Sequence, residues 1–240
     1  MQTPTVRNGL GQPVGASIPD WNPCPRPALA PMQGRLIRLE PTDPARDARA
    51  LFEAFALDPD AAHWTYLPYG PWDTAEAYES GLAVLCALPD TQFFTILEQA
   101  GGRPLGVAAY LRIDPANGSI EVGHLRFSSL LQRRPAATEA MYLMMRHAFD
   151  ELGYRRYEWK CDSRNAPSLA AAVRLGFRLE GTFRQAMVLK GRNRDTTWLS
   201  ILDTEWPLVR SALEAWLSPA NFDEDGRQRQ GLAEIRAGLA

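Results

Sequence analysis

The sequence is poor in cysteine and histidine, with three of each among its 240 residues. Its cysteines are odd in number and far apart, so they form neither a disulfide framework nor the paired spacing of a zinc site. This usage is typical of a reducing compartment. We therefore expect a cytoplasmic protein that holds no metal ion.

Long apolar runs and an excess of one charge are also missing. No stretch approaches the ~20 apolar residues that cross a membrane, and the N-terminus lacks the charged-then-apolar order of a signal peptide. The net charge of −2 gives no positive field for nonspecific nucleic-acid binding. With 45% hydrophobic residues, the chain can form a sizeable core. We expect a globular protein that binds neither membranes nor nucleic acid.

Composition and periodicity divide the chain into three regions. Residues 1–33 are rich in proline, glycine and small polar residues, which predicts an extended N-terminal arm with Trp21 as an apolar anchor. Residues 34–207 carry regular periodicities and are expected to form the domain. Residues 208–240 are expected to be a C-terminal helix and a polar tail.

Within the domain, apolar spacing alternates between the periods of strands and helices. Strands are predicted over residues 34–40, 92–98, 104–113, 119–127, 154–161, 179–190 and 194–206. Helices are predicted over residues 44–55, 74–88, 135–152, 166–175 and 207–217. This order combines hairpins with a crossover helix, and it predicts an α/β (mixed α+β) fold with helices on both faces of a sheet.

A basic turn at residues 131–140 separates the strand at 119–127 from the helix that follows. Backbone N–H groups and the positive end of the helix dipole attract anions at such a place. Arg133 and Arg134 add charges suited to phosphate oxygens. The turn therefore predicts a site for a phosphorylated cofactor, with a solvated basic turn as the alternative.

The order of elements, with this turn after the fourth strand, resembles the GCN5-related N-acetyltransferase (GNAT) superfamily. The closer resemblance is to its branch of ribosomal-protein N-terminal acetyltransferases. Gln132-Arg133-Arg134-Pro135-Ala136-Ala137 is similar to the family's Gln/Arg-x-x-Gly-x-Gly/Ala motif, except for proline at the first glycine. Asn165, Ser168 and Leu175-Gly176-Phe177 resemble its second cofactor-contacting block. The resemblance implies a GNAT-like central mixed, mostly antiparallel sheet with helices on both faces.

It also implies acetyl-CoA as the cofactor, or another acyl-CoA. The fourth strand's backbone would bond the pantetheine arm, the turn would hold the pyrophosphate, and the second block would contact the cofactor from the next loop. The residues so implied are Leu125, Arg126, Phe127, Arg133, Arg134, Ala136, Ala137, Thr138, Asn165 and Ser168. Pro135 removes one N–H donor but suits the first turn of a helix.

Acetyl transfer to an amine needs a base for the amine and a leaving thiolate. Glu121 resembles the glutamate of the family's Glu-x-Gly segment and is the candidate base. His124 lies three positions further, so a regular strand would point it to the opposite face. Ala172 stands where many members carry the tyrosine acid, so the thiolate either leaves unassisted or uses another group.

The aromatic loop at residues 63–72 is the candidate acceptor site, with Trp64, Tyr66 and Tyr69 as substrate-binding residues. The resemblance implies an amine acceptor, either a protein N-terminus or a small molecule, in a ternary complex. Transfer of a bulkier group such as succinyl and a catalytically silent CoA-binding module are the alternatives. A monomer and a homodimer are both compatible with the sequence.

Overall fold

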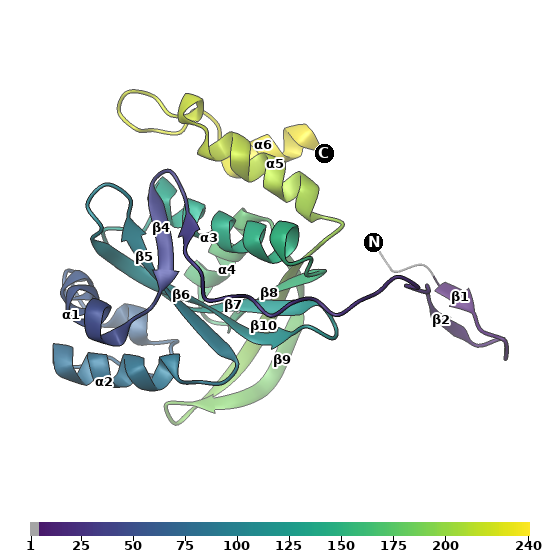
Figure 1. Ribbon diagram of the computed structural model, residues 1–240, viewed down its shortest axis with the longest axis horizontal. Helices are drawn as coiled ribbons and strands as arrows, with labels where there is room; N and C mark the ends of the chain where they lie inside the picture. The colour runs from purple at the N-terminus through teal and green to yellow at the C-terminus, as the bar shows by residue number, and fades with distance from the viewer. Residues whose placement is uncertain (1–4) are drawn as a thin grey trace.

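The computed structural model describes residues 5–240, and its main feature is an eight-stranded sheet (Figure 1). In spatial order its strands are β3 (Met32–Gln33), β4 (Ile37–Pro41), β5 (Thr91–Glu98), β6 (Pro104–Asp114), β7 (Ser119–Phe127), β8 (Arg156–Asp162), β10 (Arg192–Leu202) and β9 (Arg178–Leu189). Neighbouring strands are antiparallel, except that β7 and β8 are parallel. The predicted mixed, mostly antiparallel sheet is confirmed.

Polar caps and glycine set the helix ends where the sequence predicts them. The helices are α1 (Pro44–Phe55), α2 (Ala75–Cys86), α3 (Pro135–Arg146), α4 (Ala166–Leu175), α5 (Trp206–Leu217) and α6 (Leu232–Leu239). Asp43, Thr74 and Asn165 each accept a hydrogen bond from a first-turn amide of α1, α2 or α4. Gly176 ends α4 with φ 113°, a left-handed conformation that glycine adopts without strain.

The helices cover both faces of the sheet, as β6 shows. Val107 and Ala109 pack with α1 and α2, whereas Ala108 and Tyr110 between them pack with α3 and α5 on the opposite face. Figure 1 shows α1 and α2 beneath the β4–β6 end of the sheet, with α3 and α5 above it. Strand alternation thus divides the interior into two apolar clusters.

Helix α3 is shorter than predicted and ends in a π-helical turn, His147–Glu151. The hydroxyl of Tyr110 donates to the carbonyl of Met144, 2.6 Å away, inside the last α-helical turn. A side chain that inserts into the helical hydrogen-bond ladder is a recognised cause of such distortion. Met141, Met144 and Met145 of α3 are all buried and belong to the core.

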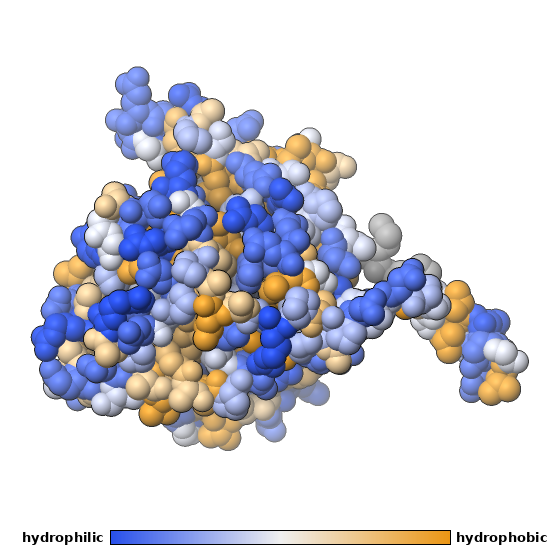
Figure 2. Space-filling model, viewed as in Figure 1, coloured by the Kyte–Doolittle hydropathy of each residue, from blue (hydrophilic) through white to orange (hydrophobic). Residues whose placement is uncertain are grey.

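The N-terminal arm carries a small hairpin, β1 (Thr5–Arg7) and β2 (Pro13–Gly15), which projects from the domain (Figure 1). Its apolar side chains are exposed, as Figure 2 also shows. Beyond the hairpin the arm follows the domain surface. Trp21 Nε1 donates to the carbonyl of Ala116 at 2.9 Å, so the expected anchor does dock. It lies against Gly118, where a Cβ would meet the indole ring.

The C-terminal region is more ordered than a polar tail. After α5 the chain turns back through residues 218–231 and forms α6. Leu232 is buried in the main core, and Arg236 donates to two carbonyls at the end of α4. In residues 5–240, no helix has the length and apolar character needed to span a bilayer.

Candidate cofactor and acceptor site

The parallel strands β7 and β8 part in the middle of the sheet. Their register runs from Ser119–Arg156 to Val122–Trp159 and stops there. Strand β7 nevertheless continues to Phe127, and β8 to Asp162. The backbone of residues 123–127 therefore faces β8 without pairing with it. A ligand with its own donors and acceptors can bond an unpaired strand edge of this kind.

A β-bulge lies where the strands part. Gly123 pairs with Ala109 and Arg126 pairs with Val107, so two residues of β7 lie opposite one residue of β6. His124 has φ 52° there, an uncommon conformation for a residue with a Cβ. Bulges redirect side chains and are over-represented near active sites.

The bulge overturns the expectation that His124 and Glu121 point to opposite faces. Ile120 and Val122 belong to the cluster on the α3 side, so Glu121 between them faces the α1–α2 side. His124 packs on that same side, with its ring 5.0 Å from Phe93. The expectation assumed a regular strand, and the extra residue changes the alternation.

Glu121 is buried within a group of charges. Lys160 Nζ lies 2.7 Å and Arg112 Nε 3.6 Å from the same carboxylate oxygen, Oε2. Burial raises the pKa of Glu121, although Lys160 opposes this shift. Within residues 5–240, both ion pairs of this carboxylate are made by Oε2, and none is made by Oε1. The carboxylate thus has one oxygen held by cations and a second available as a proton acceptor.

His124 is held by the aromatic loop. Its Nδ1 lies 3.0 Å from the hydroxyl of Tyr69, and the two rings stack. Burial lowers the pKa of His124 to about 4, so the imidazole is neutral near pH 7. A neutral imidazole carries one N–H donor and one acceptor nitrogen.

The basic turn at residues 131–140, which we call the anion turn, has backbone amides of two kinds. Some are free to bind a ligand, and others are hydrogen-bonded within the turn. The amides of Arg134 and Ala137 bond to Leu131 and Arg134 carbonyls, at 3.3 and 3.1 Å. The amides of Arg133 and Ala136 have no backbone acceptor among residues 5–240. Arg133 has φ 58°, and the side chains of Arg133 and Arg134 are exposed. Free amides beside exposed guanidinium groups fit a pyrophosphate.

Arg126 contributes backbone only. Its side chain is 2% exposed and pairs with Asp58, beneath the rings of Phe55 and Trp64. The carbonyl of Phe127 accepts one bond from Arg126 Nη1 and one from Gln132 Nε2, both at 2.7 Å. The groups of β7 that remain for a ligand are therefore chiefly those of residues 123–126.

The side chains of the second cofactor-contacting block already make hydrogen bonds within the protein. Asn165 Oδ1 accepts from the amide of Ser168, as a helix cap does. Ser168 Oγ accepts from Trp159 Nε1 at 3.0 Å. Cys161 is buried beside them, and burial raises the pKa of its thiol. Cys161 is therefore a core residue.

The three aromatic candidates for the acceptor occupy different environments. Trp64 is 8% exposed and belongs to the cluster of α1 and α2, so its ring is a packing group. Tyr66 is half-buried and donates to the carbonyl of Arg164 at 3.0 Å. Tyr69 is the one that reaches His124. Lys190, in the β9–β10 turn, fixes the loop by donating to the carbonyls of Trp64 and Gly70.

Lys160 and Asp58 were not predicted from the sequence, because each acts through a contact distant in the chain. Lys160 and Glu158 are two residues apart on β8, so both side chains lie on the face that carries Glu121. Nothing in the local sequence marks Asp58, and the basic hairpin that contains Lys190 does not indicate its contact with the aromatic loop.

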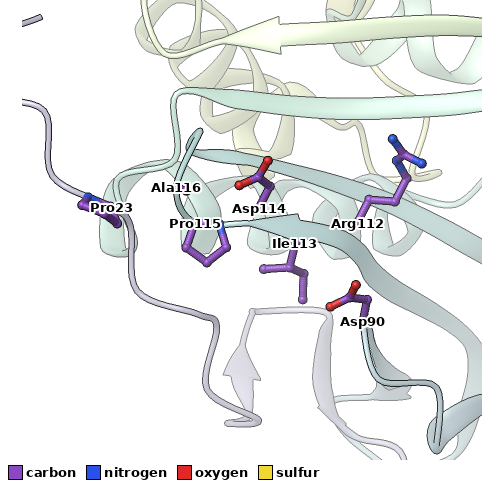
Figure 3. A pocket seen from close by; sticks show the side chains of 7 residues that line it. All are labelled: Pro23, Asp90, Arg112, Ile113, Asp114, Pro115 and Ala116. Atoms are coloured by element: carbon purple, nitrogen blue, oxygen red, sulfur yellow. The ribbon is translucent and has the colours of Figure 1, made fainter.

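A surface depression of about 630 Å³ lies at the end of β6, and Arg112, which contacts Glu121, is among its lining residues. It opens between Pro23 of the arm and the end of β6, and its other lining residues include Asp90 and Asp114 (Figure 3). No residue of the anion turn or the aromatic loop lines it. In residues 5–240, no cluster of three or more histidine, cysteine or acidic side chains could hold a metal ion.

Residues 36–178 match the sequence profile described as "Acetyltransferase (GNAT) domain". The crystal structure of a GCN5-related N-acetyltransferase from Brucella melitensis is 46% identical, covers 92% of this chain and 100% of its own, and has a TM-score of 0.89. The ribosomal-protein-serine acetyltransferase of Escherichia coli (strain K12) is 30% identical over 102 residues, 42% of this chain. An uncharacterized N-acetyltransferase p20 of Bacillus licheniformis is 28% identical over 113 residues, 47% of this chain. The matches span 56% and 63% of the length of these two curated relatives.

Proposed function

The chain belongs to the GNAT acetyltransferase family, and from this we propose that it transfers an acetyl group from acetyl-CoA to a primary amine. The observation that supports this most directly is the parting of β7 and β8 next to the anion turn. It places an unpaired strand edge, free amides and two exposed arginines in one region. These groups match the amide-bearing arm and the pyrophosphate of CoA.

When bound, acetyl-CoA supplies an activated thioester carbonyl. The backbone of residues 123–126 would hold the pantetheine arm, and the amides of Arg133 and Ala136 would hold the pyrophosphate. Asn165 caps α4 and Ser168 accepts from Trp159, and both would contact the cofactor from the loop after β8. Pro135 offers no donor, and Arg133 and Arg134 compensate with charge-assisted bonds.

In our proposal, Glu121 is the general base. Its Oε1 accepts the proton that the attacking amine loses, directly or through one water, while Lys160 fixes Oε2. His124 lies on the same face and orients the acceptor by a neutral hydrogen bond. Ala172 is fully buried and supplies no acid. The thiolate leaves unassisted, since a thiol pKa of ~8.5 makes it a tolerable leaving group near neutral pH.

We propose a protein or peptide N-terminus as the acceptor. The E. coli relative is a ribosomal-protein-serine acetyltransferase. An α-amine, of pKa ~7.7–8, is partly neutral at pH 7, whereas a lysine amine of pKa ~10.4 is not. Two cations beside Oε2 weaken Glu121 as a base. Such a base suits an α-amine better than a lysine amine, because the α-amine loses its proton more easily.

The test is a thiol-release assay with acetyl-CoA and peptides that begin with serine, alanine or methionine. Each peptide has a matched control in which the N-terminus is blocked and a lysine is present. We expect release of CoA and a mass increase at the free α-amine only. Tight binding of acetyl-CoA with no turnover on peptides or small amines would contradict the proposal. Parallel reactions with succinyl-CoA test the choice of acyl group.

A further inference from the structure

Arg174, in the last turn of α4, reaches the first turn of α3. Its Nη1 donates to Thr138 Oγ1 at 3.0 Å, and its guanidinium carbon lies 4.6 Å from the ring centroid of Trp216. Thr138 follows Pro135 by three residues, so it lies about 4.5 Å along the helix axis from the start of α3. Arg174 is therefore a neighbour of the anion turn that comes from a different element.

The C-terminal helices hold this guanidinium in place. Trp216, beneath it, donates from Nε1 to Gln228 at 2.9 Å and packs edge-on against Phe222. Arg236 of α6 donates to the carbonyl of Arg174 itself at 3.0 Å. All four supporting residues lie beyond residue 178, where the family match ends. The cation thus belongs to the family domain, and the C-terminal segment orients it.

The charge of Arg174 is not neutralised by the protein. None of the ion pairs within residues 5–240 includes it, and its fixed contacts are a hydroxyl and an aromatic ring. The residue is exposed at the surface, and desolvation by its neighbours lowers its pKa with no carboxylate to oppose the shift. A guanidinium has five N–H donors, and only one has a side-chain acceptor here. Such a group is prepared for an anionic ligand.

We infer that Arg174 binds the 3′-phosphate on the ribose of CoA, and that α5 and α6 complete the cofactor site by orienting it. The inference rests on the proposed use of CoA. The amides of Arg133 and Ala136 and the exposed arginines of the turn serve the pyrophosphate. A separate cation, about one helical turn away, fits the separate phosphate that the same molecule carries.

The test measures the affinities of CoA and 3′-dephospho-CoA by calorimetry for the wild type and Arg174→Gln. A charge-assisted bond to phosphate predicts that the wild type prefers CoA about tenfold or more. In Arg174→Gln this preference should fall to about onefold through weaker CoA binding, with 3′-dephospho-CoA affinity unchanged. The matched control is Arg49→Gln, an exposed α1 residue paired with Glu76, which should keep the preference.

Equal weakening of both ligands in Arg174→Gln, or an unchanged preference, would overturn the assignment while leaving CoA binding intact. Failure of the wild type to bind either ligand would instead reject the proposed function. Trp216→Leu removes the ring that orients Arg174 and should reduce the preference without abolishing it. If Arg174→Gln does not fold, Arg174→Lys keeps a charge but lacks the planar fork. Arg174→Lys should then show a reduced preference for CoA over 3′-dephospho-CoA, with an unchanged melting temperature.

Discussion

The hydroxyl of Tyr69 lies 3.0 Å from Nδ1 of His124, and their ring centroids are 5.5 Å apart. One residue comes from the aromatic loop and the other from the bulge of β7. The pair therefore joins the aromatic loop, the proposed acceptor site, to the strand that would bind the thioester arm of CoA. Because the imidazole is buried beside aromatic rings, it is kept neutral.

The neutral state of His124 makes stability depend on pH. The unfolded chain protonates this residue near pH 6.5, whereas the folded protein does so at about 4. The free energy of unfolding is therefore highest above pH 6.5. It decreases by roughly 3 kcal/mol as the pH falls to about 4. Urea unfolding across this range should show a steeper loss for the wild type than for His124→Asn.

Asparagine is the appropriate replacement because it tolerates the left-handed backbone of the bulge. His63→Asn, at an exposed position, is the matched control and should follow the wild type. Parallel pH curves for the wild type and His124→Asn would show that His124 is not held neutral.

Glu121→Gln should lower turnover by about 10²–10⁴-fold, the usual contribution of a general base. CoA affinity should be unchanged, because the side chain points to the acceptor face. Burial raises the pKa of Glu121, so wild-type turnover should decline on acidification at a pH above that of an ordinary carboxyl group. Steady-state kinetics from pH 4.5 to 8 measure both effects. Glu76→Gln, an exposed α2 residue, is the control, and comparable activity of the two variants would remove Glu121 from the mechanism.

Asp58→Ala should destabilise the fold by about 3–5 kcal/mol, because it leaves the buried Arg126 guanidinium without its carboxylate. Arg126→Met removes that charge and retains apolar volume beneath Phe55 and Trp64. The double variant should therefore lose less than the sum of the two single variants. Urea unfolding of all four proteins forms the cycle, and strict additivity would refute the coupling.

Pro135→Gly should tighten CoA binding up to about tenfold, since it restores an N–H donor at the start of α3. It should also lower the melting temperature, because proline suits the first helical position and restricts the unfolded chain. Calorimetry and thermal melts measure the two effects. Pro44→Gly makes the same change at the start of α1 and should affect only the melting temperature. Unchanged CoA affinity in Pro135→Gly would show that this position does not face the phosphates.

Local signals were sufficient for most of the fold. Asp43, Thr74 and Asn165 cap helices whose starts were predicted at or next to these residues. The short helix α6 was missed, because eight residues carry little periodic signal and its stability depends on contacts with α4 and α5.

The candidate site was less predictable than the fold. Its backbone parts, the anion turn and β7, are contiguous in sequence and could be located. The face of His124 could not, because a bulge is decided by how two strands pair. Lys160 and Arg174 acquire their partners from elements that no local pattern connects.

Lys190 has a consequence for the order in which the molecule is built. It joins the β9–β10 turn to carbonyls of the aromatic loop that precede it by 126 and 120 residues. A chain emerging from the ribosome makes its N-terminal part first, so the loop and the anion turn exist long before this lysine does. The aromatic loop can therefore receive its hydrogen bonds from Lys190 only at a late stage of folding. Nascent chains that lack the last hairpin should acquire the cofactor turn before they can select an amine.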